Sequence, residues 1–221
     1  MQLPIIKNTL ISLALVSTIA VSFACSSSIP DVESKKKSST VATTEKDGVV
    51  TAEIDANATS DQTVVASSTS EVADASVSFP PGSLAINTSI ALGEATDSSS
   101  ALTTELGLGA AVVKAAAPVY IGTAVGDIPV AAQSIALSLP LPLSAAGTNL
   151  TTAGGKLVFF YAILTAEGWK SGVKPLTSKD LVGTYLITKI LGLGYFQIAY
   201  LTTSIEAKEM TTALRPSLKK Q

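Results

Sequence analysis

The residue types that most enzymes use for catalysis are scarce in this chain of 221 residues. It has no histidine and one cysteine, Cys25. The lack of histidine excludes Ser-His-Asp and Cys-His nucleophile systems and imidazole metal sites. A lone cysteine also excludes an internal disulfide and a cysteine-rich zinc site. We therefore expect a protein that is not an enzyme and that holds no cofactor or metal.

Two acidic patterns are candidates for metal binding or catalysis. The segment DANATSD at 55–61 has oxygen side chains at alternate positions, as the start of a calcium loop does. Its sixth position is Ser60 where glycine is expected, and its twelfth is Ala66 where a bidentate glutamate is expected, so a polar turn is the favoured interpretation. Asp127 and Asp180 could be the carboxylate pair of a glycosidase, but nothing in the sequence brings them together.

Other short patterns have simpler explanations. Ser171 and Lys174 have the Ser-x-x-Lys spacing by which a helix places a lysine beside a nucleophilic serine, but the partner motifs are absent and the surrounding stretch favours turns. Trp169 could stack on a sugar, although a single tryptophan beside an apolar strand is more often part of the core. The glycine pairs at 107–109 and 192–194 lack the third glycine of a phosphate loop, and they predict bends or bulges between strands.

The N-terminus has the pattern of a signal peptide. Lys7 gives a weakly basic start, and LISLALVSTIA at 10–20 is an apolar run interrupted by small hydroxyl residues. The run is shorter than the roughly 20 residues that a membrane-spanning helix needs. We therefore predict that residues 1–24 are a cleaved leader.

The end of this leader, VSFAC at 21–25, resembles the lipobox of bacterial lipoproteins, in which a small residue precedes the lipidated cysteine. The match departs from the family at Ser22, where leucine is usual, and at Phe23, which is bulkier than the typical residue. The resemblance implies acyl chains, palmitate among them, on Cys25 and stable anchoring to the cell envelope. Ser26, in place of aspartate, implies the outer membrane. The alternative is an ordinary secretory cleavage in which Cys25 is incidental.

Residues 25–48 are rich in Ser, Thr, Lys and Glu and lack aromatic residues. Such a segment cannot bury enough apolar surface to offset its ordering entropy, so we predict a flexible tether. Beyond the leader, acidic side chains outnumber basic ones, and we expect no binding of nucleic acid.

From residue 49 onwards, short runs of β-favouring residues alternate with turn residues. Prolines lie near the run edges, where strands stop. This pattern predicts a mainly β domain over 49–204, an antiparallel β-sandwich or a barrel. We expect 94–104 to be an exposed loop and 205–221 to be a terminal helix turn or a frayed tail. The predicted strands are 49–54, 63–67, 75–79, 88–93, 110–115, 119–123, 133–139, 156–165, 181–187 and 195–201.

Part of this region resembles a known family. ASVSFPPGSL at 75–84, followed by TSIAL at 88–92, is similar to the opening of a ZU-five-type domain, the β-sandwich shared by ankyrins, netrin receptors and zonula occludens proteins. The motifs are individually short, and a generic immunoglobulin-like sandwich is the alternative. The similarity covers about 74–202 and continues in SIALSLP at 134–140, LVFFY at 157–161, EGW at 167–169 and LGYFQI at 193–198.

The ZU-five resemblance implies a scaffold or interaction role, because the eukaryotic domains mostly bind other proteins. We therefore expect a lipid-anchored lipoprotein of the cell envelope whose β domain is a non-enzymatic binding or structural module with a protein partner. The alternative function is a glycan or cell-wall binding protein, or a hydrolase with paired carboxylates.

Overall fold

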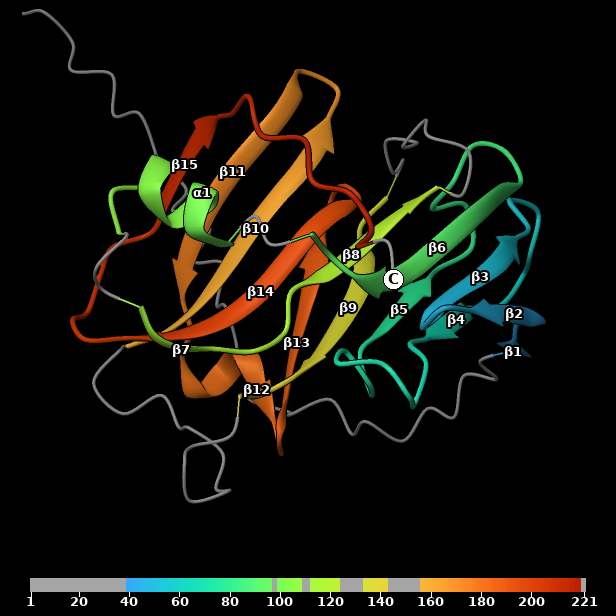
Figure 1. Cartoon of the computed structure of the whole chain (residues 1–221). Coiled ribbons are helices and arrows are strands. Elements are labelled where there is room, and N and C mark those ends of the chain that lie inside the picture. The colour runs from blue at the N-terminus through green and yellow to red at the C-terminus, as the bar shows by residue number, and fades with distance from the viewer. Residues whose placement is uncertain (1–38, 97–98, 109–111, 124–132, 143–155, 220–221) are drawn as a thin grey trace, which may run out of the picture. The chain divides into compact units, whose positions relative to one another are not determined.

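A computed structural model describes residues 39–96, 99–108, 112–123, 133–142 and 156–219 (Figure 1). These residues all belong to one unit, Lys36–Gln221. The predicted leader, Cys25 and the tether up to residue 38 lie outside the described residues, and so does Asp127.

The smaller sheet, sheet A, pairs its strands in the order β1-β4-β5-β9-β13-β12. Its ladders are antiparallel apart from the short parallel pair β1 and β4. The strands are β1 (Ser39–Thr40), β4 (Gln62–Val65), β5 (Ser76–Phe79), β9 (Ile135–Pro140), β12 (Leu181–Val182) and β13 (Tyr185–Ile190).

The larger sheet, sheet B, has the order β15-β11-β10-β14-β8-β6-β3-β2, and β7 also pairs with β14. Its ladders are all antiparallel. The strands are β2 (Thr43–Lys46), β3 (Val49–Ile54), β6 (Thr88–Glu94), β7 (Val112–Ala115), β8 (Val119–Thr123), β10 (Leu157–Thr165), β11 (Gly168–Pro175), β14 (Gly194–Leu201) and β15 (Lys208–Thr211).

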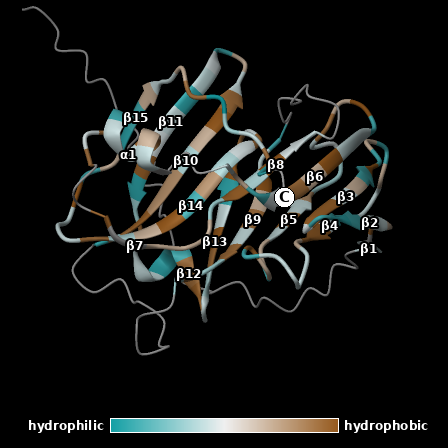
Figure 2. Cartoon of the chain, in the orientation of Figure 1, coloured by the Kyte–Doolittle hydropathy of each residue, from teal (hydrophilic) through white to brown (hydrophobic). Residues whose placement is uncertain are grey.

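The two sheets pack on each other through an apolar core. In β9, the alternation of IALSLP buries every second side chain and leaves the others partly exposed. The core between the sheets includes Phe79 and Leu137 from sheet A and Leu92 and Phe196 from sheet B. Figure 2 shows the hydrophobic residues concentrated on the strands of both sheets. The predicted antiparallel β-sandwich is therefore confirmed.

Over β8, β10, β11 and β14, sheet B is buried on its second face as well, whereas the outward side chains of β3 are partly or fully exposed. The helix α1 (Ser99–Glu105) and C-terminal side chains such as Leu214 pack over the buried part and form a separate core, which includes Leu102, Phe160 and Tyr195. This double burial explains why LVFFYAILT in β10 is almost continuously apolar, since an element covered on both faces does not alternate.

Three expectations about local structure are wrong. The loop expected at 94–104 contains α1, whose Leu102 is buried against sheet B. The strand expected at 181–187 is interrupted by a turn in which Gly183 has φ 59°, which separates β12 from β13. Gly107 follows a helix and not a strand: with φ 77° it ends α1, where the N–H of Leu108 donates to the carbonyl of Thr103.

Both predicted ends of the domain are also corrected. Within the tether expected at 25–48, residues 43–48 belong to a hairpin in which β2 pairs with β3, because Asp47 and Gly48 form a two-residue turn with positive φ. The tail expected at 205–221 supplies β15 and a bridge between Ala95 and Leu218, because its apolar side chains cover the outer core.

Candidate functional site

The predicted calcium-like segment forms a turn. The Asp55 carboxylate accepts a hydrogen bond from the N–H of Asn57 at 2.9 Å, and the Asp55 carbonyl accepts one from the N–H of Ala58 at 3.2 Å. A carboxylate that closes its own turn in this way is typical of a polar Asx turn, which was the favoured interpretation. Across the described residues, no three acidic or cysteine side chains are grouped as a metal site would require.

The Ser-x-x-Lys pair does not form a nucleophilic site. Both residues lie on β11, where positions three apart face opposite sides of the sheet. Ser171 is fully buried on the outer face of sheet B and donates a hydrogen bond to Glu105 Oε2 at 3.2 Å. Lys174 Nζ lies 2.7 Å from Asp180 Oδ1. The serine and the lysine therefore have different partners, as expected for a coincidental match.

Asp180 is occupied by structural contacts. It ends the short 3-10 helix η2 (Ser178–Asp180), and its Oδ2 accepts hydrogen bonds from the backbone and the hydroxyl of Thr177. Although desolvation alone would raise it, the pKa of Asp180 is lowered by the hydrogen bonds from Lys174 and Thr177. A carboxylate held in its ionised form does not suit the general acid of a glycosidase. Its suggested partner Asp127 lies outside the described residues.

Trp169 is half-buried on the outer face of sheet B. Its ring packs against Arg215 of the C-terminal segment, with the guanidinium carbon 5.6 Å from the ring centroid. This cation-π contact helps to hold the C-terminal segment on the sheet. The ring therefore has a structural partner and faces away from the space between the sheets.

The outer face of sheet A has a different character from that of sheet B. In β4, β5, β9 and β13 every second side chain is partly or fully exposed, and Lys189 is the one charged residue among these outward positions. The register places most of the outward residues in two rows of four, and Tyr185 and Pro140 form a further pair beside them. The rows are Thr63, Ser78, Ala136, Lys189, and Val65, Ser76, Ser138, Ile187.

This face is nearly uncharged, and most of its side chains are small. Val65 and Ile187 at the ends of one row are 49% and 48% exposed, and Val182 on the edge strand is 60% exposed. Interface centres are poor in charged residues, and exposed apolar groups that gather on one face mark interaction sites. The outer face of sheet A is therefore a candidate protein-binding surface.

A second candidate lies inside the sandwich, where β13 faces β10, β11 and β15. A cleft with a volume of about 240 Å³ opens there between the two sheets. On the sheet B side its floor is aromatic: Phe159 and Phe196 are stacked with centroids 6.0 Å apart, and Tyr161 lies 5.9 Å from Phe159. Ile190 and Leu191 line the sheet A side.

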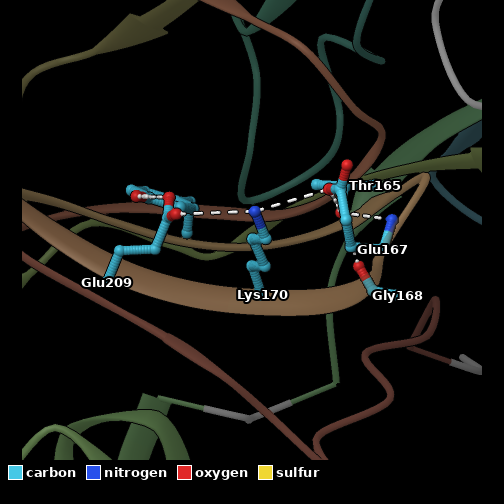
Figure 3. Close-up of polar contacts among 6 residues, drawn as sticks. Thr165, Glu167, Gly168, Lys170 and Glu209 are labelled. Atoms are coloured by element: carbon cyan, nitrogen blue, oxygen red, sulfur yellow. Dashed lines mark hydrogen bonds and ion pairs between the residues drawn. The ribbon is translucent and has the colours of Figure 1, made fainter.

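Polar side chains border this cleft. The Tyr161 hydroxyl donates to Glu209 Oε2 at 2.6 Å, and Lys170 lies between Glu209 and Glu167 at 3.9 Å and 3.4 Å (Figure 3). Burial, followed by the hydrogen bond to Glu209 and its negative charge, raises the pKa of Tyr161, so the phenol is neutral at physiological pH. Thr165 donates a hydrogen bond to Glu167.

These polar groups can bind but are poorly placed to transfer protons. The hydrogen bond from Thr165, followed by its backbone hydrogen bond and the charge of Lys170, lowers the pKa of Glu167, and Glu209 is paired with Lys170. The raised pKa of Tyr161 moves it away from neutral pH, where a catalytic base would need to titrate. The arrangement therefore offers hydrogen bonds and an aromatic surface.

Sequence reasoning missed both candidate surfaces. The residues of the cleft come from strands far apart in the chain, and Tyr161 and Glu209 are 48 positions apart. A signal for the outer face of sheet A was present in the alternation of Ser and Ala with aliphatic residues in β5 and β9.

Comparison with known proteins leaves the family open. No protein-family model matches the chain, and no match is found among curated proteins. In the described part of the chain, no helix is long and apolar enough to span a bilayer. The ZU-five-type resemblance and the lipobox resemblance at Cys25 accordingly stay predictions.

Proposed function

We propose that this chain is a lipid-anchored protein of the bacterial cell envelope, and that its β domain is a non-enzymatic module that binds another protein through the outer face of sheet A. The observation that carries the proposal is the contrast between the sheets. Sheet B has its outer face over β8, β10, β11 and β14 covered by α1 and C-terminal side chains, whereas the outward side chains of sheet A are partly or fully exposed.

The chemistry of this face defines the partner. With Lys189 as the one charge among the outward positions, the face favours a mostly uncharged partner surface, because a charged group opposite any of the other outward positions would lose water without gaining a counter-charge. The side chains of Ser76, Ala136 and Ser138 are small, so the surface of a partner protein can approach the sheet closely. A second β-sheet face with small and aliphatic residues meets both requirements.

The size of the face predicts weak binding. Four strands about 4.8 Å apart, each with about five residues at 3.4 Å, give a projected area of roughly 300 Å². A stable interface buries about 800 Å² on each partner. We therefore expect a transient complex, which suits a protein that is concentrated with its partner at one membrane.

The anchor supports this role. If Cys25 carries lipid, the domain is held at the membrane, and a high local concentration compensates for a weak interface. Intact-mass spectrometry of the protein from bacterial membranes, compared with Cys25→Ala, tests the anchor. A lipid-sized mass that is lost in the variant supports it, and an unmodified Cys25 in the mature wild-type chain contradicts it.

The binding face is tested by cross-linking in membranes. A photoreactive amino acid at Ser138 should give an adduct with one partner, and the same residue at exposed Thr104 on α1 should not. The charge introduced by Ser76→Lys, beside Ser138 in the register, should abolish the adduct. Equal adducts from both positions, or an adduct that survives Ser76→Lys, would refute the proposed face.

A further inference from the structure

The cleft between the sheets is built around a tyrosine ring that lies flat on sheet B. Tyr161 and Gly172 are directly opposite each other on β10 and β11, and a side chain at Gly172 would place its Cβ 2.4 Å from the Tyr161 ring. The ring therefore occupies the space above Gly172 and reaches across β11 to Glu209 on β15. One face of the ring rests on the backbone, and the ring lines the cleft.

The bond to Glu209 fixes this ring. The hydroxyl donates to the carboxylate at 2.6 Å, and Glu209 pairs directly with Gly172 in the sheet. A phenol held at both ends loses little entropy when a ligand stacks on it. Gly172 and Glu209 thus make Tyr161 a preorganised platform.

Charged groups of both signs border the platform. Lys174, Lys189 and Glu209 line the cleft. Lys170 is paired with Glu209 and with Glu167, and Lys174 is paired with Asp180, so three ammonium groups and three carboxylates lie at or next to the border. These charges balance, so the cleft favours neither an anion nor a cation. A neutral ligand with several hydroxyl groups fits such a border, because each hydroxyl both donates and accepts.

The volume limits the ligand to one ring or one side chain. Drug-sized ligands occupy pockets of roughly 300–1,000 Å³, and this cleft has about 240 Å³. A pyranose presents an apolar face of C–H groups and an edge of hydroxyls. It therefore matches a flat aromatic floor beside a polar border. A purely apolar side chain matches less well, because it would leave the polar groups at the border without hydrogen-bond partners.

We infer that this cleft is a glycan-binding subsite in which one pyranose ring stacks on Tyr161 and its hydroxyls hydrogen-bond to Glu209 and the neighbouring lysines. Lys189 is the one cleft-lining residue that also stands in the outward rows of sheet A, so the site adds a second ligand to the proposed protein-binding role. Trp169, the residue that the sequence suggested for stacking, lies on the opposite face of β11.

Two neutral oligosaccharides, chitotriose and maltotriose, are suitable probes for titration against the purified full chain, followed by NMR chemical shifts. We expect a Kd on the order of 1 mM for at least one of them, as for a ligand held through a single ring. Tyr161→Leu should weaken binding by about tenfold or more, because it keeps the apolar bulk and removes the flat ring. Tyr161→Phe should bind better than Tyr161→Leu.

Controls separate binding from folding. Trp169→Ala should leave the affinity unchanged, and in the Tyr161 variants the emission of Trp169 should keep its native spectrum because this ring lies outside the cleft. Absence of binding by both sugars at 10-fold above the expected Kd, or equal affinity in Tyr161→Leu, would overturn the glycan subsite. Capture of an apolar peptide in place of sugar would do the same, and none of these results bears on the cross-linking at Ser138.

Discussion

Replacement of Gly48 by alanine tests whether the domain begins at β2 or at β3. Asp47 and Gly48 connect Lys46 to Val49 and have φ of 52° and 71°. Two consecutive residues with positive φ define the mirror-image turn that suits the twist of a hairpin. Alanine in this conformation places its Cβ too close to the following carbonyl oxygen, at a cost of about 1–2 kcal/mol. Gly48→Ala should destabilise the fold by that amount.

Urea denaturation measures this cost directly. With a slope of about 2 kcal/mol per molar urea, the midpoint should fall by roughly 0.5–1 M. Asp47→Asn is the matched control, since asparagine tolerates the left-handed region, and its midpoint should change little. Native-state hydrogen exchange gives a second readout: the amides of Thr44 and Lys46 should be protected, because alternate residues of β2 bond to β3. An unchanged midpoint together with unprotected amides would refute the hairpin and show that Thr43–Gly48 belong to the flexible tether.

Three further variants test the cores and one carboxylate. Phe160→Ala, at a fully buried site on the outer face of sheet B, should cost about 3–5 kcal/mol in the free energy of unfolding, and a loss below about 1 kcal/mol would show that this core is loosely packed. Gln197→Leu removes the acceptor of the Tyr195 hydroxyl and the donor to the Ala116 carbonyl, and calorimetry should show a loss of about 1–3 kcal/mol. Because the folded pKa of Asp180 is lowered, its contribution to stability is present above the unfolded pKa and is lost as pH falls through the folded pKa. The free energy of unfolding of wild type should therefore exceed that of Asp180→Asn by a constant amount above about pH 5, and the difference should shrink below about pH 4. A difference that does not depend on pH would contradict the lowered pKa of Asp180.

Strands with strong alternation or a continuous apolar run could be predicted closely. The expected strands 49–54 and 119–123 coincide with β3 and β8, because each has β-branched residues and ends at turn-favouring neighbours. The hairpin before β3 was also predictable, since Asp-Gly between two β-favouring runs is a strong turn signal. Because Thr43–Lys46 are polar, these residues were assigned to the tether and the hairpin was missed.

Other strands depend on contacts that the sequence does not display. β11 has the sequence GWKSGVKP, with two glycines and two lysines, and it is a strand because β10 and β15 pair with it on both sides. β15 is charged and exposed, as suits an edge strand that must not pair with other chains. The helix α1 is short and depends on the packing of Leu102 against sheet B.

The candidate surfaces were harder to predict than the fold for the same reason. The platform in the cleft exists because Gly172 leaves space for Tyr161, and neither residue is unusual in its own segment. Their pairing is set by the register of two strands, and their partner Glu209 comes from a third. Sequence motifs such as Ser171 with Lys174 lie within one segment, where alternation separates the two side chains.

The two outer faces should respond in opposite ways to the same substitution, and this separates binding from folding. Ser138 and Ala162 are both small residues within long ladders, but Ser138 is partly exposed on sheet A whereas Ala162 is 1% exposed beneath the cover of sheet B. Lysine at 138 can extend into water, so Ser138→Lys should change stability by no more than about 0.5 kcal/mol. Lysine at 162 would bury an unpaired charge and displace the covering segment, so Ala162→Lys should lose several kcal/mol or fail to fold. If chemical denaturation gave equal stabilities for the two variants, sheet B would not be covered, and the contrast on which the proposed binding face rests would disappear.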